Sequence, residues 1–258
     1  MTGKNTGDNY RGSVALITGG SRGIGFASAK ALAEMGFDIA LCSRNRKELE
    51  KASEEIKKEN VNCLFQPIDV SREAEVITFV RSVYESYKRI DVLVNNAGIQ
   101  LNKPFLELSS TEWHSVLAIN LDSYFYFCKY VGKHMTEQRG GKIINISSVL
   151  SKFALPGRAP YSVSKAGIEA LTRILASEWA KYSILVNAIA PGHVDTELVR
   201  SDIKRGLLDE KTMQERGVLG RIGVIDEISS VVAFLASHKA SYITGQTFVV
   251  DGGFSIKK

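Results

Sequence analysis

The sequence is poor in the residues that build disulfide frameworks and metal centres. Its 258 residues include only three cysteines and four histidines. Cys42, Cys63 and Cys128 form no CxxC motif, and their odd number argues against a disulfide framework. The histidines are too widely scattered to indicate a metal site. We therefore expect reduced, buried thiols, no bound metal and a cytoplasmic location.

Long apolar runs and dense charge tracts are absent as well. No stretch is apolar over the roughly 20 residues that a membrane-spanning helix needs, and the first residues lack the apolar segment of a secretory signal. The net charge is +5, but the Lys and Arg residues are spread along the chain. No basic tract interleaved with aromatic residues indicates a nucleic-acid-binding surface. We expect neither a membrane nor a nucleic acid as partner.

The composition is that of a single globular domain. Hydrophobic residues make up 44% of the chain and charged residues 24%, with no shift that marks a second domain. A chain of this length can bury one substantial core. We expect one domain over residues 12–258, and a flexible leader over the polar, glycine-containing residues 1–11.

Short apolar segments alternate with stretches of helical periodicity. We expect strands over residues 13–18, 38–42, 63–66, 91–95, 142–147, 185–190 and 247–250, and long helices over 111–137 and 161–181. Continuous apolar strands separated by helices predict a parallel sheet covered on both faces, an α/β fold of the doubly wound kind. Ligands of such sheets bind beyond the carboxyl ends of the strands.

A glycine-rich turn follows the first expected strand. The segment VALITGGSRGIG, residues 14–25, passes from an apolar strand through a turn into an amphipathic helix, as a dinucleotide site requires. Gly19, Gly23 and Gly25 permit a tight turn and close approach of the backbone to a pyrophosphate. The alternative is a glycine-rich turn without a ligand, since the spacing TGxxxGxG differs from the commoner GxGxxG.

The end of the second expected strand indicates which dinucleotide binds. NAD sites usually place Asp or Glu there to accept hydrogen bonds from the ribose 2′-hydroxyl. This strand ends in Ser43 and Arg44, and Asp38 lies at its opposite end. Arg44 can pair with a 2′-phosphate, and Arg22 in the glycine turn offers a second guanidinium. The pattern predicts NADP(H).

A hydroxyl, a phenol and an ammonium in the middle of the chain could together move a proton. Tyr161 and Lys165 are four residues apart in YSVSK, so their side chains share one face if the segment is helical. An unperturbed Tyr titrates near ~10, and a neighbouring cation would bring its pKa closer to neutrality. Ser148 precedes them. Alone, the YxxxK pattern also fits a surface Tyr beside a solvated Lys.

These motifs, in this order and spacing, resemble those of the single-domain short-chain dehydrogenases/reductases. The resemblance covers nearly all of the chain after the first ten residues or so. It rests on TGGSRGIG (18–25), DV (69–70), NNAG (95–98), IN (119–120), ISS (146–148), YSVSK (161–165), VNAIAPG (186–192) and TGQTFVVDGG (244–253). It implies a Rossmann fold with a seven-stranded parallel sheet, a nicotinamide cofactor and a homotetramer.

The resemblance also implies a role for each matching residue. Tyr161 would exchange a proton with the substrate oxygen, and Ser148 would hydrogen-bond that oxygen. Lys165 would lower the Tyr161 pKa, and Asn120 would hold a water that links Lys165 to solvent. The family interval of thirteen residues from serine to tyrosine selects Ser148 over Ser147. The expected cofactor-binding residues are Gly19, Ser21, Arg22, Gly23, Ile24, Gly25, Ser43, Arg44, Asp69, Val70, Asn96, Ala97, Gly98, Tyr161, Lys165, Pro191, Gly192, Val194 and Thr196.

The substrate is less well defined by the motifs. The chain is most similar to 3-oxoacyl-carrier-protein reductases, which implies a 3-oxoacyl thioester as substrate and acyl carrier protein as a partner. Lys142 and Lys181 would then dock the carrier, although Tyr182 departs from the arginine expected there. Dehydrogenases of sugars, sugar acids such as gluconate, polyols and steroids share the same motifs. The charged, turn-rich segment 193–220 is expected to be a substrate lid.

Other roles remain open at this level. A non-catalytic dinucleotide-binding sensor would not need Ser148, Tyr161, Lys165 and Asn120 together, and a methyltransferase has no use for YxxxK. For Asn95, a structural role at a strand end is as consistent with the sequence as a cofactor contact. Candidate pocket-wall residues, each of which could equally be ordinary packing, are Leu150, Phe153, Leu155 and His193.

Overall fold

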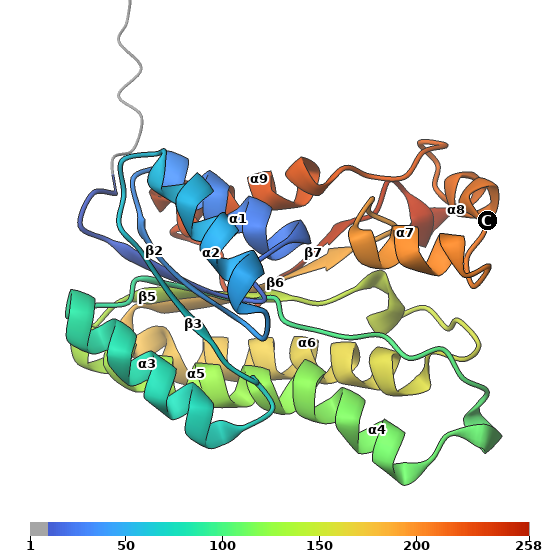
Figure 1. Ribbon diagram of the computed structural model, residues 1–258, viewed down its shortest axis with the longest axis horizontal. Helices are drawn as coiled ribbons and strands as arrows, with labels where there is room; N and C mark the ends of the chain where they lie inside the picture. Colours follow the sequence, from blue (N-terminus) through green and yellow to red (C-terminus); the bar gives the residue numbers. More distant parts are fainter. Residues whose placement is uncertain (1–9, 258) are drawn as a thin grey trace, which may run out of the picture.

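Seven parallel strands form one continuous sheet in the computed structural model, which describes residues 10–257. The strands are β1 (Val14–Thr18), β2 (Asp38–Ser43), β3 (Cys63–Pro67), β4 (Val92–Asn95), β5 (Gly141–Ile146), β6 (Ile184–Pro191) and β7 (Thr247–Val250). Their order across the sheet is 3-2-1-4-5-6-7, and Figure 1 shows the sheet lying between layers of helices. The expected α/β fold and all seven expected strands are confirmed, and no strand end differs by more than one residue from its expected position.

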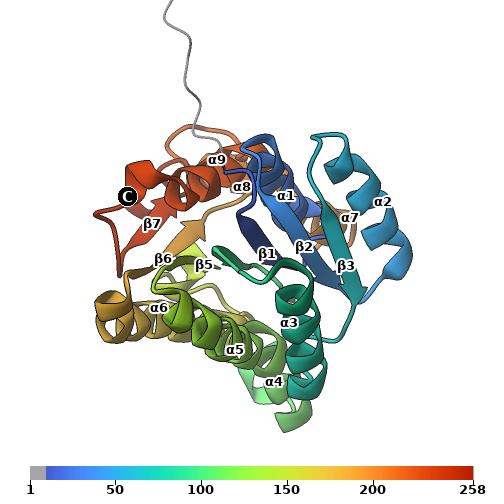
Figure 2. The same cartoon turned by 90° about the vertical axis from the view of Figure 1, so that its left-hand side faces the viewer.

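Helices cover both faces of the sheet, as Figure 2 shows. One layer contains α1 (Gly23–Glu34), α2 (Arg46–Lys57) and α9 (Ile225–Ala236), and the other contains α3 (Glu73–Tyr87), α4 (Ser110–Leu117), α5 (Ser123–Gln138) and α6 (Ala159–Trp179). Two short helices, α7 (Glu197–Lys204) and α8 (Glu210–Arg216), lie between β6 and α9 within the segment expected to be a lid.

The continuous apolar strands follow from burial on both faces. In β1, Ala15 and Ile17 belong to the core beneath α1 and α9, whereas Val14 and Leu16 belong to the core beneath α3 and α5. Successive side chains of a strand point to opposite faces, so a strand covered on both sides needs an apolar residue at every position.

The strand order places a crevice at the carboxyl ends of β1 and β4. The chain runs outward from β1 to β2 and β3, then returns to place β4 on the other side of β1. The segments that leave β1 and β4 therefore diverge, which is where open α/β sheets bind their ligands.

The helix expected over residues 111–137 has the expected extent but is not uniform. Between α4 and α5 the chain forms a wider π-helical turn, Ala118–Asp122, which carries Asn120. Such turns occur frequently at functional sites. The second expected long helix corresponds to α6, which begins at Ala159 and ends at Trp179.

The expected leader falls mostly outside the described residues, but its last part is well packed. Tyr10 is buried, its ring stacks on Phe37 with 4.5 Å between centroids, and its hydroxyl accepts a hydrogen bond from the His238 N–H at 2.9 Å. The packed chain thus reaches back at least to Tyr10, two residues before the expected boundary at residue 12. None of the helices within residues 10–257 combines the length and the apolarity needed to cross a membrane.

Candidate active site

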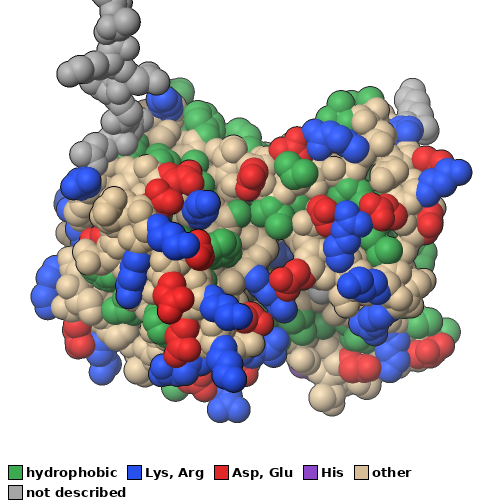
Figure 3. Space-filling model, turned by 45° about the horizontal axis from the view of Figure 1, so that its top comes forward, with side chains coloured by type: hydrophobic (Ala, Val, Ile, Leu, Met, Phe, Trp, Pro, Cys, Tyr) green, Lys and Arg blue, Asp and Glu red, His purple; other side chains and the backbone are tan. Residues whose placement is uncertain are grey.

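A cavity of about 660 Å³ opens along the carboxyl ends of the strands. Figure 3 shows the surface hollowed on the side where α7 and the glycine turn meet, with charged side chains of both signs around it. Every residue expected to bind the cofactor or act in catalysis lines this cavity except Gly25 and Asn120. Residues from six separate motifs therefore meet at one place.

The glycine turn needs its glycines for two different reasons. Gly19 and Gly23 have φ angles of 63° and 56°, a left-handed conformation that residues with a side chain rarely adopt. Gly25 instead lies beneath the turn, where a Cβ would collide with the Gly19 carbonyl and the Asn96 side chain. The Asn96 amide holds the turn by donating to the carbonyls of Thr18 and Gly19 at 3.0 and 3.2 Å. Gly25 thus shapes the cavity without lining it.

The ends of β2 and β3 form the part of the cavity suited to an adenosine. The Ser43 hydroxyl is buried and has no hydrogen-bond partner among the described residues, so it is available to a ligand. The Asp69 carboxylate accepts hydrogen bonds from the N–H and hydroxyl of Ser71. Although burial opposes it, these bonds and the charges of Arg72 and Arg44 lower the pKa of Asp69. A dinucleotide fits these residues.

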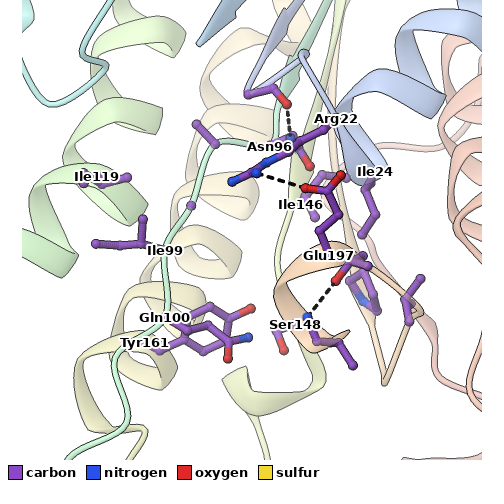
Figure 4. A pocket seen from close by; sticks show the side chains of 18 of the residues that line it. Arg22, Ile24, Asn96, Ile99, Gln100, Ile119, Ile146, Ser148, Tyr161 and Glu197 are labelled. Atoms are coloured by element: carbon purple, nitrogen blue, oxygen red, sulfur yellow. Dashed lines mark hydrogen bonds and ion pairs between the residues drawn. The ribbon is translucent and has the colours of Figure 1, made fainter. Parts of the chain in front are cut away.

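Arg22 is not a free guanidinium as the sequence suggested. Its Nη1 lies 2.9 Å from Glu197 of α7 and 3.9 Å from Glu48 of α2 (Figure 4). Glu48 also accepts a hydrogen bond from the Ser21 hydroxyl at 3.1 Å. Both glutamates line the cavity, and neither stands in a recognisable motif. A phosphate that binds Arg22 must therefore compete with two carboxylates.

The residues expected at the nicotinamide end lie where β6 leaves the sheet. A Cβ on Gly192 would meet Asp251, so the close approach of these segments requires glycine there. Val194 is buried and forms a bridge to Gly223. The Thr196 hydroxyl caps α7 by accepting a hydrogen bond from the Val199 N–H at 3.3 Å. This cap fixes the start of α7, shortly after the end of β6.

Ser148, Tyr161 and Lys165 converge from two elements. Ser148 follows β5, and the other two lie in the first turns of α6, one helical turn apart. The Lys165 Nζ donates to the Ile146 carbonyl at 2.8 Å and lies 5.6 Å from the centre of the Tyr161 ring. Burial lowers the pKa of Lys165 to about 7, because its ammonium has lost most of its water.

Burial and three neighbouring side chains shift the pKa of Tyr161. The side chain is half-buried, and burial raises its pKa above the ordinary value. Hydrogen bonds from Ser148 and Gln100 and the charge of Arg158 act in the opposite direction. The influence expected from Lys165 stays a prediction, and burial lowers the pKa of Lys165 itself to about 7.

The Asn120 side chain lies behind the cavity wall. It is completely buried, accepts a hydrogen bond from the Ile99 N–H at 2.8 Å and donates to the Ile99 carbonyl at 2.9 Å. This reciprocal pair fixes the segment after β4 against the π-helical turn. Asn95, whose role was open, is fully buried, and its side-chain amide donates to the side-chain oxygen Oδ1 of Asn145 at 2.9 Å. Its observed contacts are structural.

The substrate end of the cavity has apolar and polar walls. Leu150, Leu155 and His193 line it as expected, whereas Phe153 packs edge-to-face on Phe254 outside it. The His193 Nε2 is buried with no partner among the described residues. Burial, followed by the charges of Arg216 and Arg158, lowers the His193 pKa, so this ring is neutral at neutral pH.

Two polar residues of this wall, Gln100 and Arg158, were not identified from the sequence. The Arg158 side chain is only 3% exposed. Its Nη1 donates to Gln100 Oε1 at 2.8 Å and its Nη2 to Asp202 Oδ2 of α7 at 3.4 Å. Both residues lie outside the family motifs, and the only sequence signal was that Arg158 stands three residues before Tyr161.

The two lysines expected to dock a carrier lie away from the cavity. Lys142 is near the start of β5, where its Nζ donates to the carbonyls of Ala236 and Ser237 at 2.8 and 2.5 Å. Lys181 is in the turn before β6. Both stand at the amino ends of parallel strands, whereas the cavity is at the carboxyl ends. A carrier docked at these two lysines would therefore lie at the opposite edge of the sheet from the cavity of the same chain.

Comparison with known proteins gives consistent results. A family model described as enoyl-(acyl carrier protein) reductase matches residues 19–255. Gluconate 5-dehydrogenase from Gluconobacter oxydans is 35% identical over 248 residues, 95% of each chain. A 3-oxoacyl-[acyl-carrier-protein] reductase, FabG, from Chlamydia muridarum is 40% identical over 244 residues, 93% of this chain and 96% of the relative.

Solved structures agree closely with the fold. A putative gluconate dehydrogenase from Agrobacterium tumefaciens has a TM-score of 0.93 at 34% identity, over 98% of this chain and 99% of that one. Levodione reductase has a TM-score of 0.93 at 33% identity, over 97% of this chain and 100% of that one.

Proposed function

The chain belongs to the short-chain dehydrogenase/reductase family, and we propose that it is an NADP(H)-dependent enzyme that interconverts a ketone and a secondary alcohol. The observation that carries the proposal is the convergence of Ser148, Tyr161 and Lys165 on a cavity that also has the features of a dinucleotide site. A non-catalytic sensor would gain nothing from a phenol, a hydroxyl and a buried lysine at one wall.

The side chains of the cavity can perform the proton chemistry of a ketone reduction. A bound reduced nicotinamide supplies the hydride. Tyr161 donates its proton to the substrate oxygen, and the Ser148 hydroxyl hydrogen-bonds the same oxygen as negative charge develops. Lys165, with a pKa near neutrality, can take up or release a proton behind Tyr161. In alcohol oxidation each transfer reverses, and Tyr161 acts as the base.

The preference for NADP(H) rests on the end of β2. Ser43 with its unpartnered hydroxyl and Arg44 line the cavity where an NAD site would carry an acidic residue. Arg44 offers the planar donors that suit a 2′-phosphate. Glu48 lies nearby, and its carboxylate opposes an anion there.

We propose a 3-oxoacyl thioester as the substrate, since the oxoacyl reductases among the relatives are up to 40% identical. Acyl carrier protein would then be a partner, docking elsewhere than at Lys142 and Lys181 of the same chain. A gluconate-like sugar acid is the second candidate, because Gln100, Arg158 and His193 make part of the substrate wall polar. The enzyme is proposed to be a cytoplasmic homotetramer whose single domain, residues 12–258, carries a lid near 193–220.

A substrate panel tests the proposal. The protein is incubated with NADPH and acetoacetyl thioesters, free and carrier-bound, and with 5-ketogluconate, a polyol-derived ketone and a steroid ketone, while absorbance of the reduced nicotinamide is followed. Reduction of the thioesters, faster for the carrier-bound form, is expected. Added salt should reduce that advantage by screening the encounter with the acidic carrier. If only 5-ketogluconate is reduced, the proposed ketone reduction stands, but the proposed substrate changes from a 3-oxoacyl thioester to a sugar acid.

Tyr161→Phe is the matched test of the chemistry. It keeps the ring and removes only the proton donor, so turnover should fall at least about a hundredfold while NADPH binding, followed by nicotinamide fluorescence, stays within a factor of two to three of wild type. Turnover close to wild type would show that Tyr161 is not the acid.

A further inference from the structure

Gln100 lies at the wall of the cavity beside the Tyr161 hydroxyl. It follows β4 by five residues, in the segment that Asn120 fixes through Ile99. Figure 4 shows Gln100 next to Tyr161, with Ser148 on the same cavity. Both Gln100 and Ser148 act on the phenol, because hydrogen bonding from each lowers the pKa of Tyr161. The segment after β4 therefore brings a second polar group to the reacting hydroxyl.

Arg158 determines which end of the Gln100 amide faces Tyr161. An arginine side chain can only donate hydrogen bonds, so the amide group that meets Arg158 Nη1 at 2.8 Å must be the oxygen. The amide nitrogen, which only donates, is then directed away from Arg158. It can contact Tyr161 only as a donor to the phenol oxygen.

Arg158 is in turn held firmly enough to impose this orientation. Its side chain is 3% exposed, and Asp202 of α7 lies 3.4 Å from its Nη2. Asp202 compensates the buried charge, so the guanidinium is fixed between a carboxylate and an amide oxygen. Hydrogen bonds thus run from Asp202 of α7 through Arg158 to Gln100, which lies next to Tyr161 (Figure 4).

We propose that Gln100 is a positioning residue for the reaction, which orients the Tyr161 hydroxyl and, held by Arg158, donates a hydrogen bond that favours the deprotonated phenol oxygen. This proposal rests on the proposed function of Tyr161. A phenol oxygen that receives donors from both Ser148 and Gln100 is stabilised more as phenolate than as phenol. Consistently, both bonds and the Arg158 charge lower the Tyr161 pKa against the effect of burial.

The decisive variant is Gln100→Glu. Glutamate has nearly the same shape and can still accept from Arg158, but its carboxylate has no donor and carries a negative charge toward Tyr161. The apparent pKa of Tyr161 should rise by about one unit or more, which makes the phenolate about tenfold scarcer at a given pH. Gln100→Leu removes the donor without adding a charge, so a smaller rise is expected. Gln246→Glu, an amide-to-acid change at an exposed position outside the cavity, is the matched control.

The Tyr161 pKa is measured by ultraviolet difference titration, in which each protein is compared with its own Tyr161→Phe counterpart so that the other tyrosines cancel. This readout needs no substrate. The pH profile of kcat/KM for alcohol oxidation, with whichever alcohol the panel identifies, should move in the same direction. Circular dichroism and thermal unfolding confirm that each variant is folded.

The outcomes test the role of Gln100 separately from the proposed function of Tyr161. A raised Tyr161 pKa in Gln100→Glu, with Gln246→Glu unchanged, supports the role of Gln100. A pKa equal to wild type in Gln100→Glu overturns it, as does a change confined to KM, which would assign Gln100 and Arg158 to substrate binding. Tyr161→Phe with normal turnover would instead overturn the proposed function.

Discussion

Arg44 is the residue on which the choice between the two nicotinamide dinucleotides depends most directly. It lines the cavity one residue beyond β2 and its charge reaches Asp69 at the end of β3. Arg44→Ala should lower kcat/KM for NADPH by about tenfold or more, the loss of one charge-assisted hydrogen bond. The value for NADH should change little. Steady-state kinetics with both cofactors measures this.

The control for that experiment is Arg46→Ala. Arg46 is an exposed residue of α2 that pairs with Glu50 at 3.4 Å and does not line the cavity. It should leave the cofactor preference unchanged. If the wild-type enzyme has a higher kcat/KM with NADH than with NADPH, Ser43 and Arg44 do not confer a preference for the 2′-phosphate of NADPH.

Lys165 links the chemistry of the site to the stability of the fold. Its folded-state pKa of about 7 is well below the ordinary 10.5, so the unfolded chain binds the proton more tightly than the folded one. Stability therefore rises with pH between about 7 and 10.5, and the full cost of burying the ammonium is present below pH 7. Lys165→Met removes that cost.

We expect Lys165→Met to raise the melting temperature, by more at pH 6 than at pH 9.5, while abolishing turnover. Thermal unfolding at the two pH values measures the difference, and Lys181→Met at an exposed position serves as the control. A rise in melting temperature that is equal at both pH values would mean that the pKa of Lys165 is not lowered by burial.

The helix α7, which lies in the segment proposed to be the lid, is joined to the cavity wall by two ion pairs. Arg22 of the glycine turn meets Glu197 at its start, and the buried Arg158 meets Asp202 farther along. The first pair is exposed and contributes little by itself. The second is buried, and breaking it would leave Arg158 without its compensating charge. Asp202 is therefore the position where the lid is most sensitive to change.

Asp202→Ala should destabilise the docked lid by on the order of 3–5 kcal/mol, the range for a buried pair that loses one partner. Hydrogen exchange in α7 should speed up markedly while exchange in β1 and β4 stays slow. Asp226→Ala, an exposed acidic residue of α9, is the comparison variant. If hydrogen exchange in α7 is unchanged in Asp202→Ala, contacts other than the Arg158–Asp202 pair hold this helix against the cavity wall.

The outer sides of α5 and α6 carry apolar residues that the sheet does not cover. Phe125 is 48% exposed and Ile174 is 54% exposed. We expect these helices to pack against another copy of the chain, and sedimentation at micromolar concentration should give a tetramer. Phe125→Glu combined with Ile174→Glu should dissociate it, whereas Leu106→Glu, in the short 3₁₀ helix Phe105–Glu107 before α4, should not. A wild-type monomer would refute the expected assembly.

The sequence alone determined the fold and most of the proposed site, because both depend on local features. Short stretches of chain show these features directly. They are the apolar strands buried on both faces, the glycines at left-handed φ angles, and the Tyr and Lys one helical turn apart. In parallel strands all carboxyl ends lie at one edge of the sheet, so motifs that follow strands were expected to meet there, and they line one cavity.

Only the tertiary structure decided which other side chains meet those motifs. Gln100, Arg158, Glu48 and Glu197 reach the cavity from loops and helices whose neighbours are set by packing, and no spacing along the chain reveals a contact between residues 58 or 175 positions apart. Charge, burial and hydrogen bonding act through space, so the pKa values of Tyr161 and Lys165 belong to the assembled fold and not to the motif.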